Sequence, residues 1–447
     1  MRTDKKPCIL AVDNGSSSVR AALFDDMGEL VPDSLVKAER SFRTDADGAF
    51  TLDADEAVEQ ARIVIDRVLE GRDENVRFVS FCAFWHSLCG LDSNGRAVSE
   101  ILGWADTRAR RYSAMLKENF DENAIHARTG AHFHSSFWPA KLLWLRHERP
   151  RDFERAAAWH SFADVCQQRL FGDARTGISM ASATGLFDQR ECRWDGELLR
   201  FIGVGEGQLP TVLGADAAVR PDEAARKRWP QLADAEILPA IGDGAAENVG
   251  SGSLRLGEAT LTIGTSAAVR MAYEGDPPAS IPRGLWSYRI DDKRVIVGGA
   301  LSDGGNLIEL IRARFNVRGD ISEELRARAF DPKIRVEPFF FGERSTGYRE
   351  DAKGSIEGVS EHHDGVDVIL AAMYAVAERL ADIVERLERV APIRRITASG
   401  GALREFPRWR SVIEEKLGRT LETSDAAEAA LKGAALLALE RLGTIKL

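Results

Sequence analysis

Residues 9–24 read ILAVDNGSSSVRAALF, and residues 261–270 repeat the pattern as LTIGTSAAVR. Each segment predicts an apolar strand, a tight turn of glycine and hydroxyl residues, and a second strand that begins at Val-Arg. Such turns let backbone N–H groups approach an anion closely, so two of them could hold a phosphate chain from both sides. An ordinary hairpin is the alternative for either segment alone. The repetition favours two related halves over a short-period repeat.

The length and composition of the chain set its domain organisation. At roughly 150 residues a domain, 447 residues predict two or three domains. Residues 214–234 are rich in Ala, Asp and Arg and contain Pro221 and Pro230. We therefore expect a boundary close to this segment, which divides the chain into domains at 1–236 and 237–447.

Charge and cysteine usage exclude several classes of protein. The formal net charge of −10 argues against binding to nucleic acid or to an anionic membrane surface, although a local nest of N–H groups could still hold a small anion. The five cysteines form no CxxC pair, as is typical of reduced thiols in a cytoplasmic protein. No apolar segment is long enough for a signal peptide or a membrane span, so we expect a cytoplasmic location.

The pattern of apolar residues predicts an α/β fold in both halves. A helix is expected over 54–69, a buried strand over 76–81, and mostly helices over 108–172. In the second half, one apolar face marks a long helix over 366–387 that leads into a strand over 393–397. The last helix is expected to start around Asp425, with Glu428 in a variant capping box.

Common nucleotide-binding loops are absent from the sequence. Neither a GxxxxGK segment followed by Ser or Thr nor a Rossmann fingerprint occurs, so a nucleotide must be held in another way. Gly400 and Gly401 stand where a strand hands over to a helix, which is either a plain turn or an anion platform. Asp13 ends the first strand beside the turn, where a carboxylate would repel phosphate unless Mg²⁺ lies between them. The alternative is an Asx turn made by Asp13 itself.

Asp243 is the candidate for proton transfer. It lies between Gly242 and Gly244, just before a helix of small residues. An N-cap is the simpler interpretation. The helix N-terminus would keep the carboxylate ionised and aimed, as a base needs to be in order to accept a proton from a hydroxyl that attacks phosphorus.

An aromatic and polar group of residues is typical of sugar binding. The segment 104–108 reads WADTR, and Trp85 and His86 add a second aromatic group. Core packing is the alternative for Trp85 and Trp104, and a satisfied interior histidine is the alternative for His86. The eight histidines show no metal-ligand spacing, so a zinc site is not expected.

Taken together, these segments resemble the FGGY carbohydrate kinases, a branch of the actin, hexokinase and Hsp70 ATPase superfamily. The resemblance covers nearly the whole chain. It rests on an ordered set of short motifs: Asp13–Arg20, Trp104–Arg108, Ala140–Leu145, Thr184–Asp188, Gly242–Ala246, Gly264–Ser266, Gly298–Leu301, Gly342–Arg344 and Ser399–Ala402.

The resemblance implies two ribonuclease-H-like (actin-like ATPase) domains with a cleft between them. It also implies transfer of the γ-phosphate of ATP to a hydroxyl of a small sugar, sugar acid or polyol, with gluconate or a ketopentose favoured. The expected partner is this small-molecule carbohydrate, and a homodimer is left open. By the same resemblance Asp243 would be the base that faces the sugar, and Asp13 would approach Mg²⁺. The other expected site residues are Gly15, Ser16, Ser17, Arg20, Gly264 and Thr265 at the phosphates, Gly305, Glu309 and Gly401 on the nucleotide side, and His86, Trp104 and Asp106 at the sugar.

Two departures from the family pattern bear on the substrate. Ser16 stands where the family usually has Thr, which keeps the hydroxyl. Residues 85–88 read WHSL in place of the usual MHGL. The sugar pocket is therefore the part of the family pattern that can least be carried over to this chain. A non-catalytic sugar or nucleotide sensor on the same fold is the main alternative function, and an actin-like filament or chaperone ATPase is a third.

Overall fold

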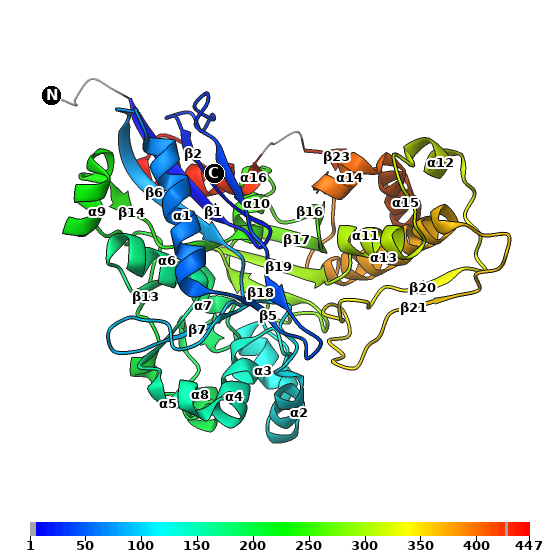
Figure 1. Ribbon diagram of the computed structural model, residues 1–447, viewed down its shortest axis with the longest axis horizontal. Coiled ribbons are helices and arrows are strands. Elements are labelled where there is room, and N and C mark those ends of the chain that lie inside the picture. The colour runs from blue at the N-terminus through cyan, green and yellow to red at the C-terminus, as the bar shows by residue number, and fades with distance from the viewer. Residues whose placement is uncertain (1–5, 425–427) are drawn as a thin grey trace.

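The computed structural model describes residues 6–424 and 428–447 (Figure 1). Two six-stranded sheets form its centre. The first has the order β14-β6-β1-β2-β3, with β15 also paired to β6, and the second has the order β18-β19-β17-β16-β22-β23. Their bounds are β1 Pro7–Asn14, β2 Ser18–Phe24, β3 Val36–Glu39, β6 Asn75–Ala83, β14 Glu236–Ile237 and β15 Ile241–Gly242, then β16 Glu258–Ile263, β17 Ala267–Glu274, β18 Trp286–Arg289, β19 Arg294–Leu301, β22 Arg395–Ser399 and β23 Glu422–Thr423.

The two sheets share one central arrangement. In the first, β1 is antiparallel to β2 and parallel to β6, and in the second, β16 is antiparallel to β17 and parallel to β22. Both predicted hairpins are therefore confirmed, and each lies beside a parallel strand that ends at the same edge of its sheet. This internal repetition is the two-domain actin-like ATPase architecture that we expected.

Long amphipathic helices cover the sheets. The helix α1 (Ala54–Leu69) packs on the first sheet, and Asp53 caps it by accepting hydrogen bonds from the backbone N–H groups of Asp55 and Glu56. The helix α13 (Gly365–Leu387) packs on the second sheet with its apolar face buried. Both helices confirm the predicted ranges, since hydrophobic spacing of this length leaves little ambiguity.

The last helix, α16 (Ala429–Leu442), returns to the first sheet and crosses α10 (Asp243–Gly250), so the red end of the ribbon lies beside the blue strands (Figure 1). The crossing is close because it uses glycines. A Cβ at Gly433 would lie 1.8 Å from the carbonyl oxygen of Ala246, and one at Gly250 would lie 1.9 Å from that of Ala429. Side chains at either position would push the two helices apart.

The remaining elements fall into two groups. One group surrounds the first sheet: β4 (Arg43–Thr44), β5 (Phe50–Leu52), β7 (Cys89–Leu91), β8 (Ile101–Leu102), α2 (Arg110–Asn119), α3 (Glu122–Thr129), α4 (Trp138–Glu148), α5 (Pro150–Arg155), β9 (Ala158–His160), α6 (Phe162–Phe171), β10 (Thr176–Gly177), α7 (Ile178–Ser182), β11 (Phe187–Asp188), β12 (Arg193–Trp194), α8 (Gly196–Ile202), β13 (Val212–Leu213) and α9 (Glu223–Arg228). The other lies around the second sheet: α11 (Gly305–Arg314), α12 (Ser322–Ala327), β20 (Arg335–Glu337), β21 (Ser355–Glu357), α14 (Gly401–Glu405) and α15 (Pro407–Leu417).

The predicted start of the last helix was wrong: Asp425 lies outside the described residues, and α16 begins at Ala429 after Glu428, which has a left-handed φ of 56°. The side chain of Glu428 pairs with Arg20 rather than with the helix. The division at 236/237 falls inside β14, a strand of the first sheet, and stays a prediction. Among the helices of the described chain, none combines the length and the apolar character needed to cross a membrane.

Candidate active site

Two cavities meet beside the first hairpin. The smaller one has a volume of about 290 Å³ and is walled largely by aromatic and arginine side chains. The larger one has a volume of about 790 Å³ and lies against the glycines that follow β22. Five residues line both cavities: Ser16, Ser17, Arg20, Asp243 and Arg270. The two hydroxyl residues, two guanidinium groups and one carboxylate therefore stand where the two spaces join.

The first turn needs glycine, because a Cβ at Gly15 would lie 2.9 Å from the carbonyl oxygen of Ser18. The second turn is braced from α11: the N–H of Gly305 donates to the carbonyl of Gly264 at 2.8 Å, and the N–H of Asn306 donates to that of Thr265 at 3.1 Å. Gly264 and Thr265 line the smaller cavity. The structure thus brings both predicted turns to one place, with Gly305 in a supporting position.

The third glycine turn, Gly400–Gly401, borders the larger cavity. Gly400 has a φ of 111°, and a Cβ there would lie 2.2 Å from the carbonyl oxygen of Ile263. Gly401 begins α14 and, like Gly400, lines the larger cavity. Glu309, which we expected on the nucleotide side, is exposed on α11 and does not line either of the two cavities.

Asp13 is buried at the end of β1 and lines the larger cavity. One carboxylate oxygen accepts a hydrogen bond from the Arg20 guanidinium at 2.7 Å, and the other accepts from the Cys82 thiol at 3.5 Å. Burial raises the pKa of Asp13, and the Arg20 charge opposes this effect. Arg20 also pairs with Glu428 at 2.5 Å, so Arg20 links β2 to the start of α16.

Asp243 is the first residue of α10, and Gly242 takes the N-cap position that the simpler interpretation gave to Asp243. Its carboxylate accepts a hydrogen bond from the Gly244 N–H at 2.7 Å. Burial raises the pKa of Asp243 to about 7, against the lowering effect of Arg270. Trp85 lies across the adjacent backbone, since a Cβ at Gly242 would meet its ring at 1.8 Å.

Glu247 is a polar residue that the sequence analysis missed. It lies one helical turn after Asp243 and lines the larger cavity. Its carboxylate accepts from Arg270 at 3.0 Å, from the Thr262 hydroxyl at 2.9 Å and from the Ser399 hydroxyl at 3.0 Å. It thereby ties α10 to three strands of the second sheet. The i to i+4 spacing from Asp243 was the available signal, because it places both residues on one helix face.

His86 lines the smaller cavity as a neutral imidazole. Burial lowers its pKa to about 3. Its Nδ1 lies 2.7 Å from the carbonyl oxygen of Ala183, and because a carbonyl can only accept, Nδ1 carries the hydrogen. The Nε2 atom is then an acceptor, suited to a hydroxyl of a bound sugar.

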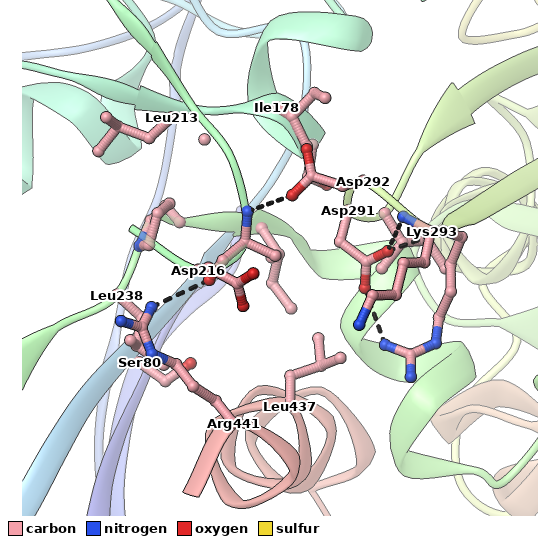
Figure 2. Close-up of a pocket in the computed structure, with 18 of the residues that line it drawn as sticks. Ser80, Ile178, Leu213, Asp216, Leu238, Asp291, Asp292, Lys293, Leu437 and Arg441 are labelled. Atoms are coloured by element: carbon pink, nitrogen blue, oxygen red, sulfur yellow. Dashed lines mark hydrogen bonds and ion pairs between the residues drawn. The ribbon is translucent and has the colours of Figure 1, made fainter. Parts of the chain in front are cut away.

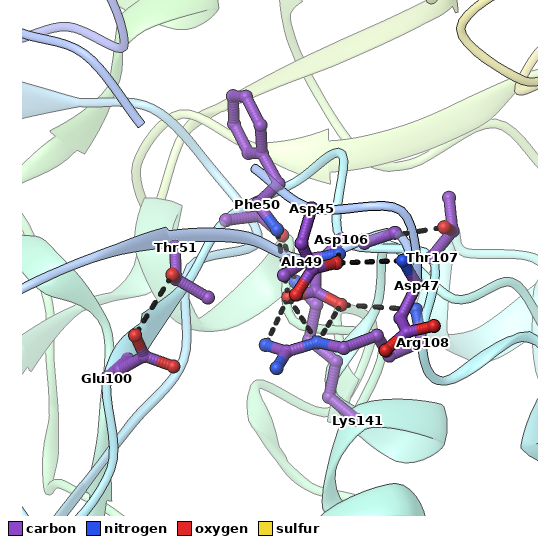
Figure 3. A network of polar contacts seen from close by, with 12 residues as sticks. Asp45, Asp47, Ala49, Phe50, Thr51, Glu100, Asp106, Thr107, Arg108 and Lys141 are labelled. Atoms are coloured by element: carbon purple, nitrogen blue, oxygen red, sulfur yellow. Dashed lines mark hydrogen bonds and ion pairs between the residues drawn. The ribbon is translucent and has the colours of Figure 1, made fainter. Parts of the chain in front are cut away.

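The residues of the 104–108 segment have two roles: one lines the smaller cavity, and another supports the segment from outside the cavity. Trp104 lines the smaller cavity, with the Arg344 guanidinium 4.4 Å from its ring. Asp106 lines neither cavity. Figure 3 shows its carboxylate turned toward Arg108, whose side chain donates at 2.7 Å, and toward the Phe50 N–H at 3.3 Å. Asp106 thus braces the segment that carries Trp104.

An aromatic floor completes the smaller cavity. Trp286 and Tyr288 stack with ring centroids 4.5 Å apart, and Trp85 meets both edge to face. Among the described residues that line this cavity, four buried donor atoms have no hydrogen-bond partner: Arg20 Nε, Trp85 Nε1, the Tyr288 hydroxyl and Arg344 Nε. Trp286 and Tyr288 carry no local signal of a site, and Arg344 appeared only within the Gly342–Arg344 motif without a role, because these residues come from strands and loops far from Trp85 in the chain.

A third cavity of about 410 Å³ lies elsewhere, between the segment 238–241, the β18–β19 turn and α16 (Figure 2). Several of its charged side chains are bonded within the protein. Arg294 pairs with Asp291 at 2.8 Å, Asp292 accepts from the Ala215 N–H at 2.5 Å, and Arg441 donates to the Ala215 carbonyl at 3.0 Å. None of the predicted site residues lines it.

Comparisons with known proteins agree with this geometry. The N-terminal domain of the FGGY family of carbohydrate kinases matches residues 8–228, and the C-terminal domain of that family matches residues 259–440. A gluconokinase of Bacillus subtilis (strain 168) is 25% identical over 98% of this chain and 88% of its own length.

Solved structures show the same fold. A ligand-bound xylulose kinase from Lactobacillus acidophilus superposes with a TM-score of 0.87 at 22% identity, over 99% of this chain and 90% of that one. A gluconate kinase from the same organism has a TM-score of 0.83 at 21% identity, over 99% and 91% of the two chains. Both family domains occur here in order and span most of the sequence, so the chain belongs to the FGGY family of carbohydrate kinases.

Proposed function

We propose that this carbohydrate kinase transfers the γ-phosphoryl group of ATP to a hydroxyl of gluconate or a ketopentose, with Asp243 as the base. The observation that carries the proposal is the position of Asp243, which lines both the aromatic cavity and the glycine-walled cavity. A sugar in the first and a nucleotide in the second would meet at this carboxylate. Family membership supports a kinase rather than the non-catalytic sensor.

Proton transfer follows from the environment of Asp243. With a pKa of about 7, the carboxylate is ionised at slightly alkaline pH and can accept the proton of the attacking hydroxyl. Arg270 and Arg20 stand at the junction of the cavities, where their charges would stabilise the transferring phosphoryl group. The turn residues Ser16 and Thr265 offer N–H and hydroxyl donors to the same group.

The residues around the larger cavity fit a nucleotide carried with Mg²⁺. Within residues 6–424 and 428–447, no group of three or more His, Cys, Asp or Glu side chains could hold a metal ion. Mg²⁺ usually takes only one or two carboxylates and completes its shell with water and substrate phosphates. Asp13 would hold it, and bound Mg²⁺ would neutralise charge on the phosphates.

The walls of the smaller cavity favour a sugar acid as acceptor. The Arg344 guanidinium donates to the Leu301 carbonyl at 2.7 Å, and no ion pair joins it to any described carboxylate. A buried cation without a counter-charge is costly, and a substrate carboxylate would remove that cost. The unpartnered donors of Trp85 and Tyr288 would also be satisfied by acceptor oxygens. Relatives of this chain are named gluconokinase and xylulose kinase, so gluconate and xylulose are the two acceptors to compare.

The test is ADP release with Mg²⁺ and ATP against D-gluconate, D-xylulose and glycerol. We expect turnover with gluconate to exceed turnover with xylulose, and chelation with EDTA to abolish it until Mg²⁺ is restored. Arg344→Met should lower kcat/KM for gluconate about 10-fold or more, since hydrogen bonds to charged groups are the strong ones. Equal losses for gluconate and xylulose would contradict a carboxylate contact, and no turnover with any acceptor would contradict the proposed reaction.

A homodimer stays a prediction, since nothing in a single chain tests it. Sedimentation equilibrium on the purified protein gives the mass directly: twice the mass of the 447-residue chain would support the dimer.

A further inference from the structure

Lys141 is a buried lysine that the proposed mechanism does not use. It lies on α4 with 1% of its surface exposed. Its ammonium donates hydrogen bonds to the carbonyl oxygen of His86 at 2.6 Å and to that of Gly103 at 2.8 Å. Burial lowers the pKa of Lys141 to about 7, and the Asp106 charge opposes this effect through space. The Asp106 carboxylate itself is bonded to Arg108 (Figure 3). Lys141 is thus held by peptide carbonyls, and no carboxylate within residues 6–424 and 428–447 forms a salt bridge with it.

The two carbonyls belong to different walls of the aromatic cavity. His86 follows β6 and lines the cavity directly, whereas Gly103 follows β8 and precedes Trp104, which forms another part of the wall. The two segments are paired next to these residues, because Leu88 and Leu102 form an isolated antiparallel bridge with N–H···O distances of 3.0 and 2.8 Å. His86 and Gly103 lie just outside this bridge, where no backbone hydrogen bond joins the one to the other. The Lys141 ammonium is a common partner that joins their backbones.

The backbone of His86 needs such support. Its φ of 68° lies in the left-handed region, which residues with a side chain rarely adopt. This conformation persists only where surrounding contacts hold it. Lys141 holds the carbonyl, and the carbonyl of Ala183 holds the ring Nδ1. Together they aim the imidazole at the cavity.

We propose that Lys141 is a positioning residue for the sugar pocket: beyond the Leu88–Leu102 bridge, it holds the carbonyls of His86 and Gly103 together and so fixes His86 relative to Trp104. The proposal rests on the proposed function, because it assigns the aromatic cavity to the sugar. Lys141 does not line either cavity, so its effect on a bound sugar passes through His86 and Trp104. Nucleotide binding, which uses the larger cavity, should be insensitive to it.

The test compares Lys141→Met with Lys141→Gln and with the control Lys117→Met. Methionine keeps the length of the side chain and removes the donors, whereas glutamine keeps two N–H donors. Lys117 lies on the exposed side of α2, a helix that packs on α4. We expect K141M to raise the KM for the best sugar acceptor by about 10- to 100-fold, because two hydrogen bonds from a buried charged donor are lost. The KM for ATP at saturating sugar should stay within about threefold.

K141Q should recover part of the sugar KM, and K117M should change neither constant. Tryptophan fluorescence gives a second readout of sugar binding, because Trp85 and Trp104 line the pocket. If the thermal melt shows that K141M does not fold, K141Q becomes the test variant. An intermediate rise in its KM for the sugar is then the result that supports the proposal. An unchanged sugar KM, or equal rises for sugar and ATP, would overturn the proposal. A wild-type enzyme without any active acceptor refutes the proposed function and the Lys141 proposal together, whereas an active wild type with an unaffected variant refutes the Lys141 proposal alone.

Discussion

The chemistry of single residues in this site is set by their surroundings. Asp243 begins a helix, where the backbone dipole favours its charge, yet it is enclosed by aromatic rings and by two other acids, Asp13 and Glu247. Burial and like charges prevail over the Arg270 charge and hold its pKa at about 7. A base whose pKa lies near neutral pH combines the ionised form with a useful affinity for protons.

The pH dependence of the reaction should follow this carboxylate. Asp243 is protonated below its pKa of about 7 and then cannot accept a proton. We expect kcat/KM to fall about tenfold for each pH unit below this value and to level off above it. Initial rates from pH 5 to 9 with constant free Mg²⁺ provide the measurement. A rate that is constant down to pH 5 would assign the base elsewhere.

Asp243→Asn separates chemistry from folding. The amide cannot accept the proton, so kcat should fall by about 10²–10⁴-fold. The folded-state pKa of Asp243 is raised, so the carboxyl opposes folding once pH rises through that pKa and the buried group ionises. The Asn variant avoids this cost, and at pH 8 its Tm should equal or exceed that of the wild type. A lower Tm, or full activity with a true substrate, would count against the assignment.

At the scale of elements, the first hairpin is held from behind by a buried cation. Arg40 follows β3 with 5% of its surface exposed, and its guanidinium donates to the carbonyls of Gly15 at 3.3 Å and Ala57 at 3.1 Å and to Gln60 at 2.9 Å. Its backbone N–H donates to the carbonyl of Ser17 at 2.9 Å. The carbonyls of the turn are therefore directed backward, which leaves its N–H and hydroxyl groups to the cavities.

Arg40→Met should therefore weaken nucleotide binding. We expect the KM for ATP to rise by about 10-fold, because the charged hydrogen bonds that fix the turn are lost. The sugar KM should change less. The matched control is Arg43→Met, which removes an exposed arginine paired with Glu56. Steady-state kinetics that show equal ATP KM values for the two variants would refute a role of Arg40 in the turn.

The start of α10 depends on a glycine rather than on a capping side chain. At Gly242 a Cβ would lie within 1.8 Å of the Trp85 ring, so Gly242→Ala must displace either the indole or the helix start that carries Asp243. A displacement of about 1 Å can cost about 10²-fold in rate, and we expect a loss of that order in kcat. Gly196→Ala is the control, because a Cβ there meets nothing within 4 Å. If both variants retain wild-type kcat, Trp85 does not constrain the base.

At the scale of the whole molecule, the aromatic cavity is built from both halves of the chain. Ser16 and Trp85 come from the first sheet and its loops, and Gly264 and Arg344 come from the second sheet and its loops. Outside the cavity lining, the Glu350 carboxylate of the second half accepts a hydrogen bond from the Ser135 hydroxyl of the first half at 2.9 Å. Such a site can exclude water from the phosphoryl group when the two halves approach each other.

Binding of the sugar should therefore compact the molecule. We expect small-angle scattering to give a smaller radius of gyration with sugar and ADP present than with either absent, because the cavity is lined from both sides. ADP alone, which would bind in the glycine-walled cavity, should reduce the radius of gyration less than sugar and ADP together. Identical scattering curves with and without both ligands would exclude closure of this kind.

Much of the site was open to prediction from short patterns. The two hairpins, the helices at 54–69 and 366–387 and the position of Asp243 follow from local alternation and spacing, which depend on neighbours a few residues away. The assignment failed where the partner is distant. Glu428 fits a capping pattern in the sequence, yet it pairs with Arg20. Asp106 stands in a sugar-like segment, yet it braces that segment from outside the cavity.

The sequence by itself determined the two strand-turn-strand repeats, the glycines that let the turns form, and the acids Asp13 and Asp243 beside them. These features are local, because backbone sterics and hydrophobic periodicity act within a few residues. Only the tertiary structure decided that the two turns share one junction, that Arg344 forms no ion pair with a carboxylate of the described residues, and that Lys141 and Arg40 hold the loops from behind. Such contacts join residues far apart in the chain, and they form only when both sheets have packed and excluded water from the groups between them.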